Sequence, residues 1–359
     1  MKSEGIYKLK KIVPALIALI GIGILSSSCA MMEFASRSDG KIKQIKIGVT
    51  IYQMEDPFIS TIPDYIGNIA KTKELTENMK ITVNVMDAKG NQNLQNDQVD
   101  KFLAQNYDVL CVNMVDRTAA SVIIDRAKAA NVPIVFFNRE PVEEDMQRWD
   151  KLYYVCSLAS ESANLEGGIV VKTYEADPKK WDKNGDEILQ YVILEGEQGH
   201  QDSLIRTEMT IKTITEAGIK LEKLSNKTAD WQRTQAGVIM SQWLEEFGDQ
   251  IEMIISNNDN MALGAIDTYQ EAQITNVPLI VGIDAIQPAL EAIKNGMLVG
   301  TVLNDAKGQG EAIFELAYAL AMDEDPVENP QDISQRYIWI PHSAVTIDNV
   351  DEVVQTMGY

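Results

Sequence analysis

The sequence is poor in histidine, cysteine and positive charge, and each shortage excludes a class of function. Its 359 residues include two histidines and three cysteines, with no CxxC pair or Cys/His cluster of the kind that binds zinc. Lysine and arginine total 32 against 53 aspartate and glutamate, a formal net charge of -21. Phosphate-rich partners need a basic face, so nucleic acid and anionic membrane surfaces are disfavoured, whereas a neutral ligand is compatible with this charge.

Long apolar runs are also scarce, and the clearest one, IVPALIALIGIGIL, lies near the start after a lysine-rich segment. This pattern predicts a signal peptide over residues 1–28. The following LSSSCA resembles a bacterial lipobox, although Leu25 stands one residue further from the cysteine than usual. We therefore expect lipidation at Cys29, anchoring outside the cytoplasm (in the periplasm or on the outer face of the cell membrane) and a polar tether over 29–43. Ordinary secretion is the alternative, and the run is short for a retained membrane span.

Beyond the tether, apolar strand-like runs alternate with helical patterns. IKIGVTIY, ITVNVMDA, DVLCVNM and PIVFFN are typical of buried strands, and NLQNDQVDKFLAQ and AASVIIDRAKAAN of helices between them. The pattern then restarts with LYYVCSL, ILQYVIL, IKLEKLS, IEMIISN, PLIVGID and LVGTVLN. Two successive series of βαβ units predict an α/β protein with two doubly wound, Rossmann-like parallel-sheet lobes. Cys111 and Cys156 lie inside apolar runs, so we expect buried free thiols.

Polar and aromatic residues follow the predicted strands, where doubly wound sheets bind their ligands. They are Asp56, Phe58, Asn113, Asn258, Asp284 and Asn304. A single asparagine after a strand is usually a turn residue, but this recurrence favours a polar cleft. The segment GEQGHQDSLIR adds His200, Asp202 and Arg206, and TADWQRTQ places Trp231 in a polar setting.

Residues 45–350 resemble the periplasmic galactose/glucose-binding proteins of ABC sugar uptake, a group with the type 1 periplasmic binding protein fold. The matching stretches are IGVTIY, EDPF, QNDQVDKFLA, NMVDR, VPIVFFNREP, KLYYV, WDKNGDEILQYVILEGEQGH, SNNDNMALGA and GTVLNDA. The resemblance implies two lobes joined by a three-segment hinge, with a hexose closed between them. On this basis we expect an N-terminal lobe over 44–138 and 304–340, and a C-terminal lobe over 139–303 and 341–359.

The resemblance also implies a role for each candidate site residue. Phe58 and Trp231 would cover the two faces of the sugar ring, and the polar contacts would be Asp56, Asn113, His200, Asp202, Arg206, Asn258, Asp284 and Asn304. Carboxylates, amides and a guanidinium can bond a rim of hydroxyls, which both donate and accept. Catalysis would need two poised carboxylates, and we expect the neighbouring amides and arginine to keep Asp56 and Asp284 ionised. A binding protein is therefore favoured over an enzyme.

A second motif, DKNGDEILQ, has the alternating oxygen ligands of an EF-hand-like calcium loop. Its side-chain ligands would be Asp182, Asn184, Asp186 and Gln190, with the Ile188 carbonyl at position seven. The resemblance adds Glu252 as a distant sixth ligand. A solvated turn is the alternative, because Glu187 occupies the sixth position, where the sharp turn favours glycine; a residue with a side chain there costs roughly 1 kcal/mol.

These observations predict an extracytoplasmic monomer that binds D-galactose or D-glucose, carries Ca²⁺ and delivers sugar to an ABC permease. The membrane would be contacted through the lipid anchor alone. The alternative is a sugar-sensing protein that signals to a membrane chemoreceptor or kinase. Both functions would use the same cleft and differ in the outer surfaces of the lobes.

Overall fold

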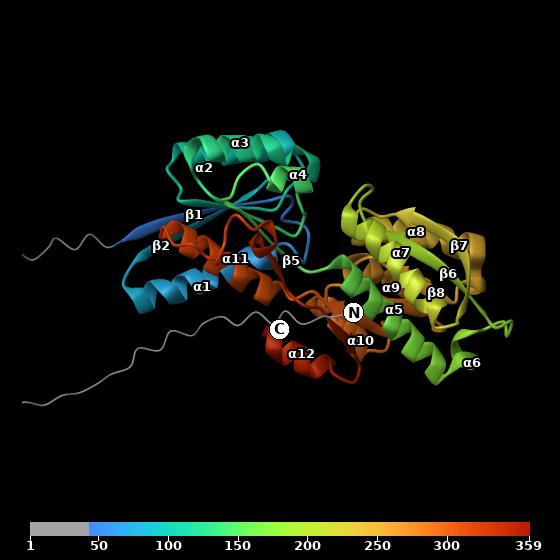
Figure 1. Cartoon of the computed structure of the whole chain (residues 1–359). Helices are drawn as coiled ribbons and strands as arrows, with labels where there is room; N and C mark the ends of the chain where they lie inside the picture. Colours follow the sequence, from blue (N-terminus) through green and yellow to red (C-terminus); the bar gives the residue numbers. More distant parts are fainter. Residues whose placement is uncertain (1–42) are drawn as a thin grey trace, which may run out of the picture. The chain divides into compact units, whose positions relative to one another are not determined.

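Two separate six-stranded sheets organise residues 43–359, the part of the chain that the computed structural model describes (Figure 1). The predicted signal peptide and Cys29 lie outside the described residues. In the first sheet the strand order is β11-β5-β4-β3-β1-β2, and every neighbouring pair is parallel. Its strands are β1 (Gln44–Ile51), β2 (Lys80–Asp87), β3 (Val109–Val112), β4 (Ile134–Phe137), β5 (Leu152–Cys156) and β11 (Tyr337–Trp339).

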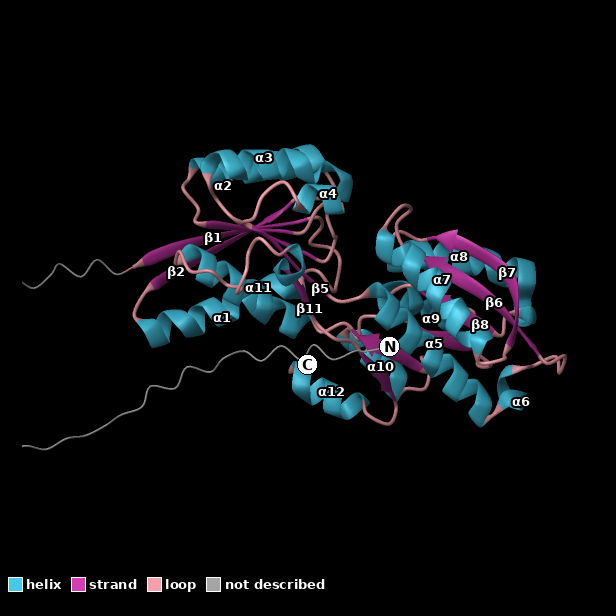
Figure 2. Cartoon of the chain, viewed as in Figure 1, coloured by secondary structure: helices cyan, strands magenta, loops and turns pink. Residues whose placement is uncertain are grey.

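Helices cover both faces of this sheet because successive strand residues point to opposite sides. Ile47 and Val49 belong to the core that includes α1 and α11, whereas Leu110 and Phe136 pack with α2 and α3. Figures 1 and 2 show these two helix pairs on opposite sides of the strands. The helices are α1 (Thr61–Glu77), α2 (Gln92–Ala104), α3 (Ala120–Ala130), the short α4 (Glu143–Met146) and α11 (Ala306–Ala321).

The second sheet repeats the plan with the order β12-β10-β9-β8-β6-β7, in which β12 alone runs antiparallel to its neighbour. Its strands are β6 (Ile188–Glu195), β7 (Lys220–Thr228), β8 (Met253–Ser256), β9 (Leu279–Val281), β10 (Gly300–Leu303) and β12 (Ser343–Thr346). The alternation along β6 is clear, because Tyr191 and Ile193 enter one hydrophobic core while Val192 and Leu194 enter another.

The helices of this second lobe are also paired. The helices α5 (Ala159–Ala176) and α7 (Gln201–Glu216) pack together, and so do α8 (Arg233–Phe247) and α9 (Asp259–Glu271). The remaining helices are α6 (Pro178–Trp181), α10 (Gln287–Lys294) and α12 (Val350–Met357). The predicted two-lobe architecture is confirmed, since each sheet has its own helix layers.

The chain passes between the sheets three times, after β5, after β10 and between β11 and β12. The predicted lobe boundary at residue 138 is wrong, because β5 pairs with β4 and β11 in the first sheet. The strand LYYVC was assigned to the second series. Buried parallel strands have similar apolar sequences in either sheet, so composition did not reveal which neighbours β5 would pair with.

Two further findings concern the interior and the membrane. Cys111 and Cys156 are buried free cysteines, as predicted. Within residues 43–359, none of the helices combines the length and the apolar character that a bilayer crossing demands.

Candidate functional site

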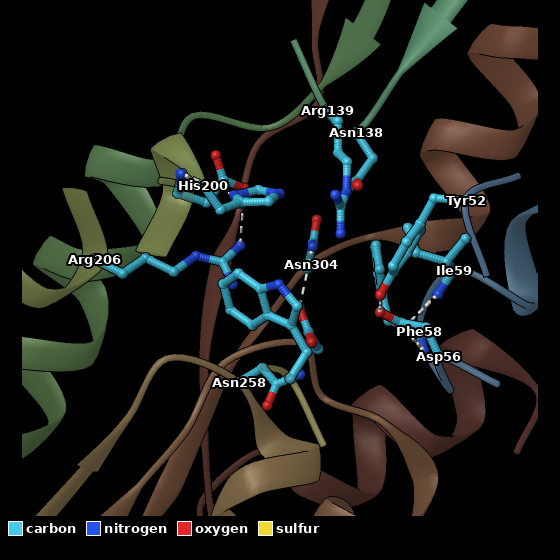
Figure 3. Close-up of a pocket in the computed structure, with 13 residues that line it drawn as sticks. Tyr52, Asp56, Phe58, Ile59, Asn138, Arg139, His200, Arg206, Asn258 and Asn304 are labelled. Atoms are coloured by element: carbon cyan, nitrogen blue, oxygen red, sulfur yellow. Dashed lines mark hydrogen bonds and ion pairs between the residues drawn. The ribbon is translucent and has the colours of Figure 1, made fainter. Parts of the chain in front are cut away.

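One pocket collects side chains from the carboxyl ends of strands in both sheets (Figure 3). Nine of the ten predicted sugar-contact residues line it: Asp56, Phe58, His200, Asp202, Arg206, Trp231, Asn258, Asp284 and Asn304. Tyr52, Ile59, Asn138 and Arg139 complete the lining.

The loop after β1 is shaped by the Asp56 carboxylate. Its Oδ1 accepts hydrogen bonds from the backbone N–H groups of Phe58 (2.9 Å) and Ile59 (3.0 Å), and its Oδ2 accepts the Tyr52 hydroxyl at 2.5 Å. Phe58 is therefore positioned by the same residue that offers oxygen to a ligand. Burial, followed by the charge of Asp56, raises the pKa of Tyr52 far above its usual range, so Tyr52 remains a neutral donor.

Asn113 does not line the pocket, contrary to the prediction. The residue is fully buried; its Oδ1 accepts the Tyr52 N–H, and its Nδ2 donates to the Phe137 carbonyl and the Asn138 side chain. The amide satisfies backbone groups where β1, β3 and β4 end, as buried polar atoms generally must. It therefore supports Asn138, which does reach the pocket.

Arg139 is a pocket residue that the sequence analysis missed. It follows β4 and is 5% exposed, with its guanidinium 3.9 Å from the centroid of the Tyr52 ring. Its Nη1 donates to the Val115 carbonyl at 2.8 Å, and its Nη2 lies 2.7 Å from Glu197 Oε2. A signal was present: NRE directly follows the strand PIVFF, the kind of position at which the other strand ends were selected.

The GHQDSLIR segment forms the start of α7, and its polar residues face the pocket from there. His200 is the N-cap of α7, and its Nδ1 accepts the Asp202 N–H at 3.2 Å. Burial, reinforced by Arg139 and Arg206, lowers the pKa of His200 to about 4. The imidazole is therefore neutral near pH 7, and Nε2 carries its proton.

Arg206 is nearly buried beside Asp202 and donates from Nη1 to the Asn257 carbonyl at 2.9 Å. Its Nη2 is 3.6 Å from Asp202 Oδ2, so the two residues pair across one helical turn. Its Nε is buried and finds no hydrogen-bond partner within residues 43–359, and the same is true of Arg139 Nε. Each lobe thus contributes to the pocket one arginine whose buried Nε–H has no partner in the described chain.

Trp231 stands edge-on to His200, with ring centroids 5.1 Å apart. Asp230 and Trp231 both have left-handed backbone angles (φ 49° and 64°), which are unusual for residues with side chains. The Asn260 side chain donates to the Trp231 carbonyl at 2.8 Å and holds this turn. A sequence reading gives no direct sign of this backbone conformation.

The three remaining residues come from the ends of β8 to β10. Asn258 is the N-cap of α9 and accepts the Met261 N–H, while Asn304 donates to Asp284 Oδ1 at 3.2 Å. Burial raises the pKa of Asp284 well above its ordinary value, and Arg206 opposes the shift. Burial therefore acts against the expected effect of the amides and arginine, which is to favour the ionised carboxylate.

The predicted calcium loop makes a sharp turn, with a left-handed backbone conformation at its sixth position. Glu187 has φ 63°, and the Asp182 carboxylate accepts the backbone N–H groups of Gly185, Asp186 and Glu187. Glu252 is 1% exposed; backbone N–H groups of Lys183, Asn184 and Gln190 donate to it, and burial raises its pKa.

The side-chain arrangement in this loop is less complete. Asn184 and Gln190 both direct their amide nitrogens to Asp186 Oδ2 at 3.0 Å. In the described part of the chain, no three Asp, Glu, His or Cys side chains gather as a metal cluster. The oxygen-rich donor set and the buried Glu252 carboxylate fit a hard cation, although the carboxylates are not drawn together.

The fold and pocket define a two-lobe α/β binding protein, and comparisons with known proteins agree. The model of the periplasmic binding protein domain family matches residues 47–325. The chain is 36% identical to the D-galactose/methyl-galactoside binding periplasmic protein of Haemophilus influenzae over 92% of this chain and 98% of the relative. It is 27% identical to the ribose import binding protein of Bacillus subtilis over 88% and 93% of the two chains.

Among solved structures, an ABC transporter solute binding protein from Bacillus halodurans with bound myo-inositol is 30% identical, with a TM-score of 0.72. The match covers 88% of this chain and 98% of that one. The chain belongs to the periplasmic binding protein family, as a sugar-binding component of ABC transport. Membership implies a location outside the cytoplasm, and the relatives are transport proteins rather than enzymes.

Proposed function

We propose that the protein binds one molecule of D-galactose or D-glucose in this pocket and delivers it to an ABC permease. The observation that carries the proposal is the pair of buried, unpaired guanidinium N–H groups of Arg139 and Arg206, one from each lobe. Buried donors generally find partners in folded proteins, and a ligand rich in oxygen could accept from the guanidinium groups of both lobes. The 36% identity to the D-galactose/methyl-galactoside binding protein supports a hexose.

The chemistry of the lining also suits a pyranose, which has apolar C–H faces and a rim of hydroxyl groups. Phe58 and Trp231 supply aromatic surface. Asp56 and Asp202 offer carboxylate oxygens, and Asn258 and Asn304 offer amides that both donate and accept. Hydrogen bonds to charged groups are the stronger ones, so the aspartates and arginines would supply most of the polar affinity.

Calorimetric titration with a panel of D-galactose, D-glucose, myo-inositol and D-ribose tests the ligand. We expect micromolar or tighter binding of both hexoses at one site per chain. Myo-inositol is the second candidate, because it is bound in the structure from Bacillus halodurans that is 30% identical to this chain. If myo-inositol or ribose binds tightly and neither hexose does, the hexose assignment is wrong.

Delivery to a permease is tested in cells. Deleting the gene should abolish uptake of labelled galactose at micromolar concentration. Uptake by cells that carry the Cys29→Ala protein should show whether the proposed lipid anchor is needed for delivery. Loss of a sugar response with uptake unchanged would favour the sensing alternative. Retained membrane association of the Cys29→Ala protein would exclude lipidation at that residue as the anchor.

We include Ca²⁺ in the proposed function as a stabilising ion. Asp182, Asn184, Asp186, Gln190 and Glu252 would hold it, with the Ile188 carbonyl. Bound only by the folded state, it would add RT ln(1 + [L]/Kd) to stability, about 2.7 kcal/mol at a hundredfold excess over Kd. Millimolar Ca²⁺ should raise the melting temperature over a chelator-treated sample, with Mg²⁺ much less effective and sugar affinity little changed. An unchanged melting temperature would exclude the ion.

A further inference from the structure

Arg139 and Glu197 form an ion pair whose partners belong to different lobes. Arg139 follows β4 of the first sheet, and Glu197 follows β6 of the second, with 2.7 Å between Nη2 and Oε2. Of the ion pairs formed within residues 43–359, this one joins the lobes and the others lie within a lobe.

The two partners relate differently to the pocket. Arg139 lines it and is 5% exposed, whereas the Glu197 side chain is 44% exposed and is not one of the lining residues. Glu197 is therefore placed to affect binding through Arg139 or through its own loop.

Three contacts hold the Arg139 guanidinium, and its Nε–H group is left without a partner. Nη1 donates to the Val115 carbonyl, the plane lies over Tyr52, and Nη2 meets Glu197, while the buried Nε has no partner within the described chain. Figure 3 shows Arg139 directed into the centre of the pocket. Because the guanidinium is planar, fixing both Nη atoms also fixes the direction of the Nε–H bond.

Glu197 also belongs to the loop that carries other pocket residues. Its backbone carbonyl accepts the His200 N–H at 3.1 Å, and its neighbour Gly196 lies against the Trp231 ring. The ion pair therefore ties the segment that ends at His200 to the opposite lobe.

We propose that Glu197 is a positioning residue for sugar binding, which holds Arg139 across the gap between the lobes and so couples lobe closure to affinity. The inference rests on the proposed function, in that a sugar must occupy this pocket. Separating the lobes breaks the 2.7 Å contact between Arg139 and Glu197, so the pair stabilises the closed form. A ligand that binds the closed form gains from anything that favours that form.

The test compares wild type with Glu197→Gln, Arg139→Met and the double variant. The probe is whichever panel sugar binds wild type most tightly, with Kd from calorimetry and the off-rate from stopped-flow tryptophan fluorescence. The matched control is Glu208→Gln, which removes the same charge from an exposed position of α7 that takes part in none of the ion pairs of residues 43–359.

We expect Glu197→Gln to raise Kd five- to fiftyfold, mainly through a faster off-rate, with the sugar-free melting temperature unchanged and Glu208→Gln like wild type. In the Arg139→Met background, Glu197→Gln should have no further effect. High salt should reduce the difference in Kd between wild type and Glu197→Gln, because it screens the ion pair. This comparison can be made even if Arg139→Met fails to fold.

A Glu197→Gln Kd within twofold of wild type would overturn the inference and leave the proposed function standing. The inference would also be overturned if Glu197→Gln raised Kd by the same factor in the Arg139→Met background, since the effect would then not pass through Arg139. If wild type binds none of the panel sugars, the proposed function fails and the inference falls with it.

Discussion

The contact between Gly196 and Trp231 allows the aromatic wall of the pocket to be displaced without changing the tryptophan. A Cβ atom added at Gly196 would lie 2.0 Å from Cη2 and 2.1 Å from Cζ2 of the indole. Carbon atoms in contact sit about 3.5–4.0 Å apart, so in Gly196→Ala the ring must move by more than 1 Å. Gly196 is not in the left-handed region, so alanine adds no backbone strain there.

The expected effect is the loss of one apolar wall. Removing a large buried side chain from contact is worth about 1.5–3 kcal/mol, which corresponds to roughly ten- to 150-fold in Kd. Trp231→Ala should weaken binding by a similar factor. The double variant should bind like Trp231→Ala alone, because no ring remains to be displaced.

Calorimetry gives the affinity, and the tryptophan fluorescence change on adding sugar reports whether the indole still meets the ligand. Gly168→Ala is the control: this glycine lies on α5, and an added Cβ would meet nothing within 4 Å. The control should bind normally and gain helix stability of about 0.5–1 kcal/mol. Wild-type affinity in Gly196→Ala would refute the placement of the indole against this strand end.

Three further predictions concern the metal loop and two buried groups. Glu187→Gly should relieve the φ of 63° at the sixth loop position and raise the melting temperature by a similar amount with and without Ca²⁺, whereas the exposed control Glu208→Gln should not. Burial raises the pKa of Glu166 to about 8, so its contribution to stability is complete below the unfolded value near 4.5 and is lost as pH rises through 8. Chemical denaturation should show Glu166→Gln losing less stability than wild type between pH 6 and 9, by about 2.7 kcal/mol for the two pH units from 6 to 8; parallel curves would contradict this. His200 should not titrate between pH 8 and 5.5, because its lowered pKa keeps the imidazole neutral there, and a midpoint near 6.5 in an NMR titration of the ring would show that it titrates as an exposed group.

Much of the fold was predictable from the sequence because the physics that specifies it is local. Runs of four to eight apolar residues separated by helical periods predicted two parallel sheets, and the rule that ligands bind beyond the carboxyl ends of strands selected most of the lining. The assignment of β5 failed since the runs are alike in both sheets, and pairing depends on contacts with β4 and β11 that lie far apart in the sequence.

The surroundings of two site residues could not be predicted from the sequence. Asn113 and Asp284 both stand at strand ends, and the sequence shows their chemistry but not their surroundings. The amide of Asn113 is used by backbone groups of three strands, and the carboxyl group of Asp284 is desolvated beyond what Arg206 offsets. Burial and neighbouring partners decide such roles, and both are set only when the two sheets and their loops are assembled.

What a ligand meets in this pocket is determined by the hydrogen-bonding capacity that the protein leaves unused. Oδ1 of Asp56 accepts two backbone N–H groups, and Nδ1 of His200 accepts that of Asp202, so these atoms are largely committed. The imidazole Nε2–H and the Nε–H groups of Arg139 and Arg206 remain as donors. The second oxygen of Asp56 already accepts the Tyr52 hydroxyl, and one carboxylate oxygen can accept more than one bond. A ligand that satisfies this set must accept at several positions while donating to a carboxylate, and every hydroxyl group of a sugar can do both.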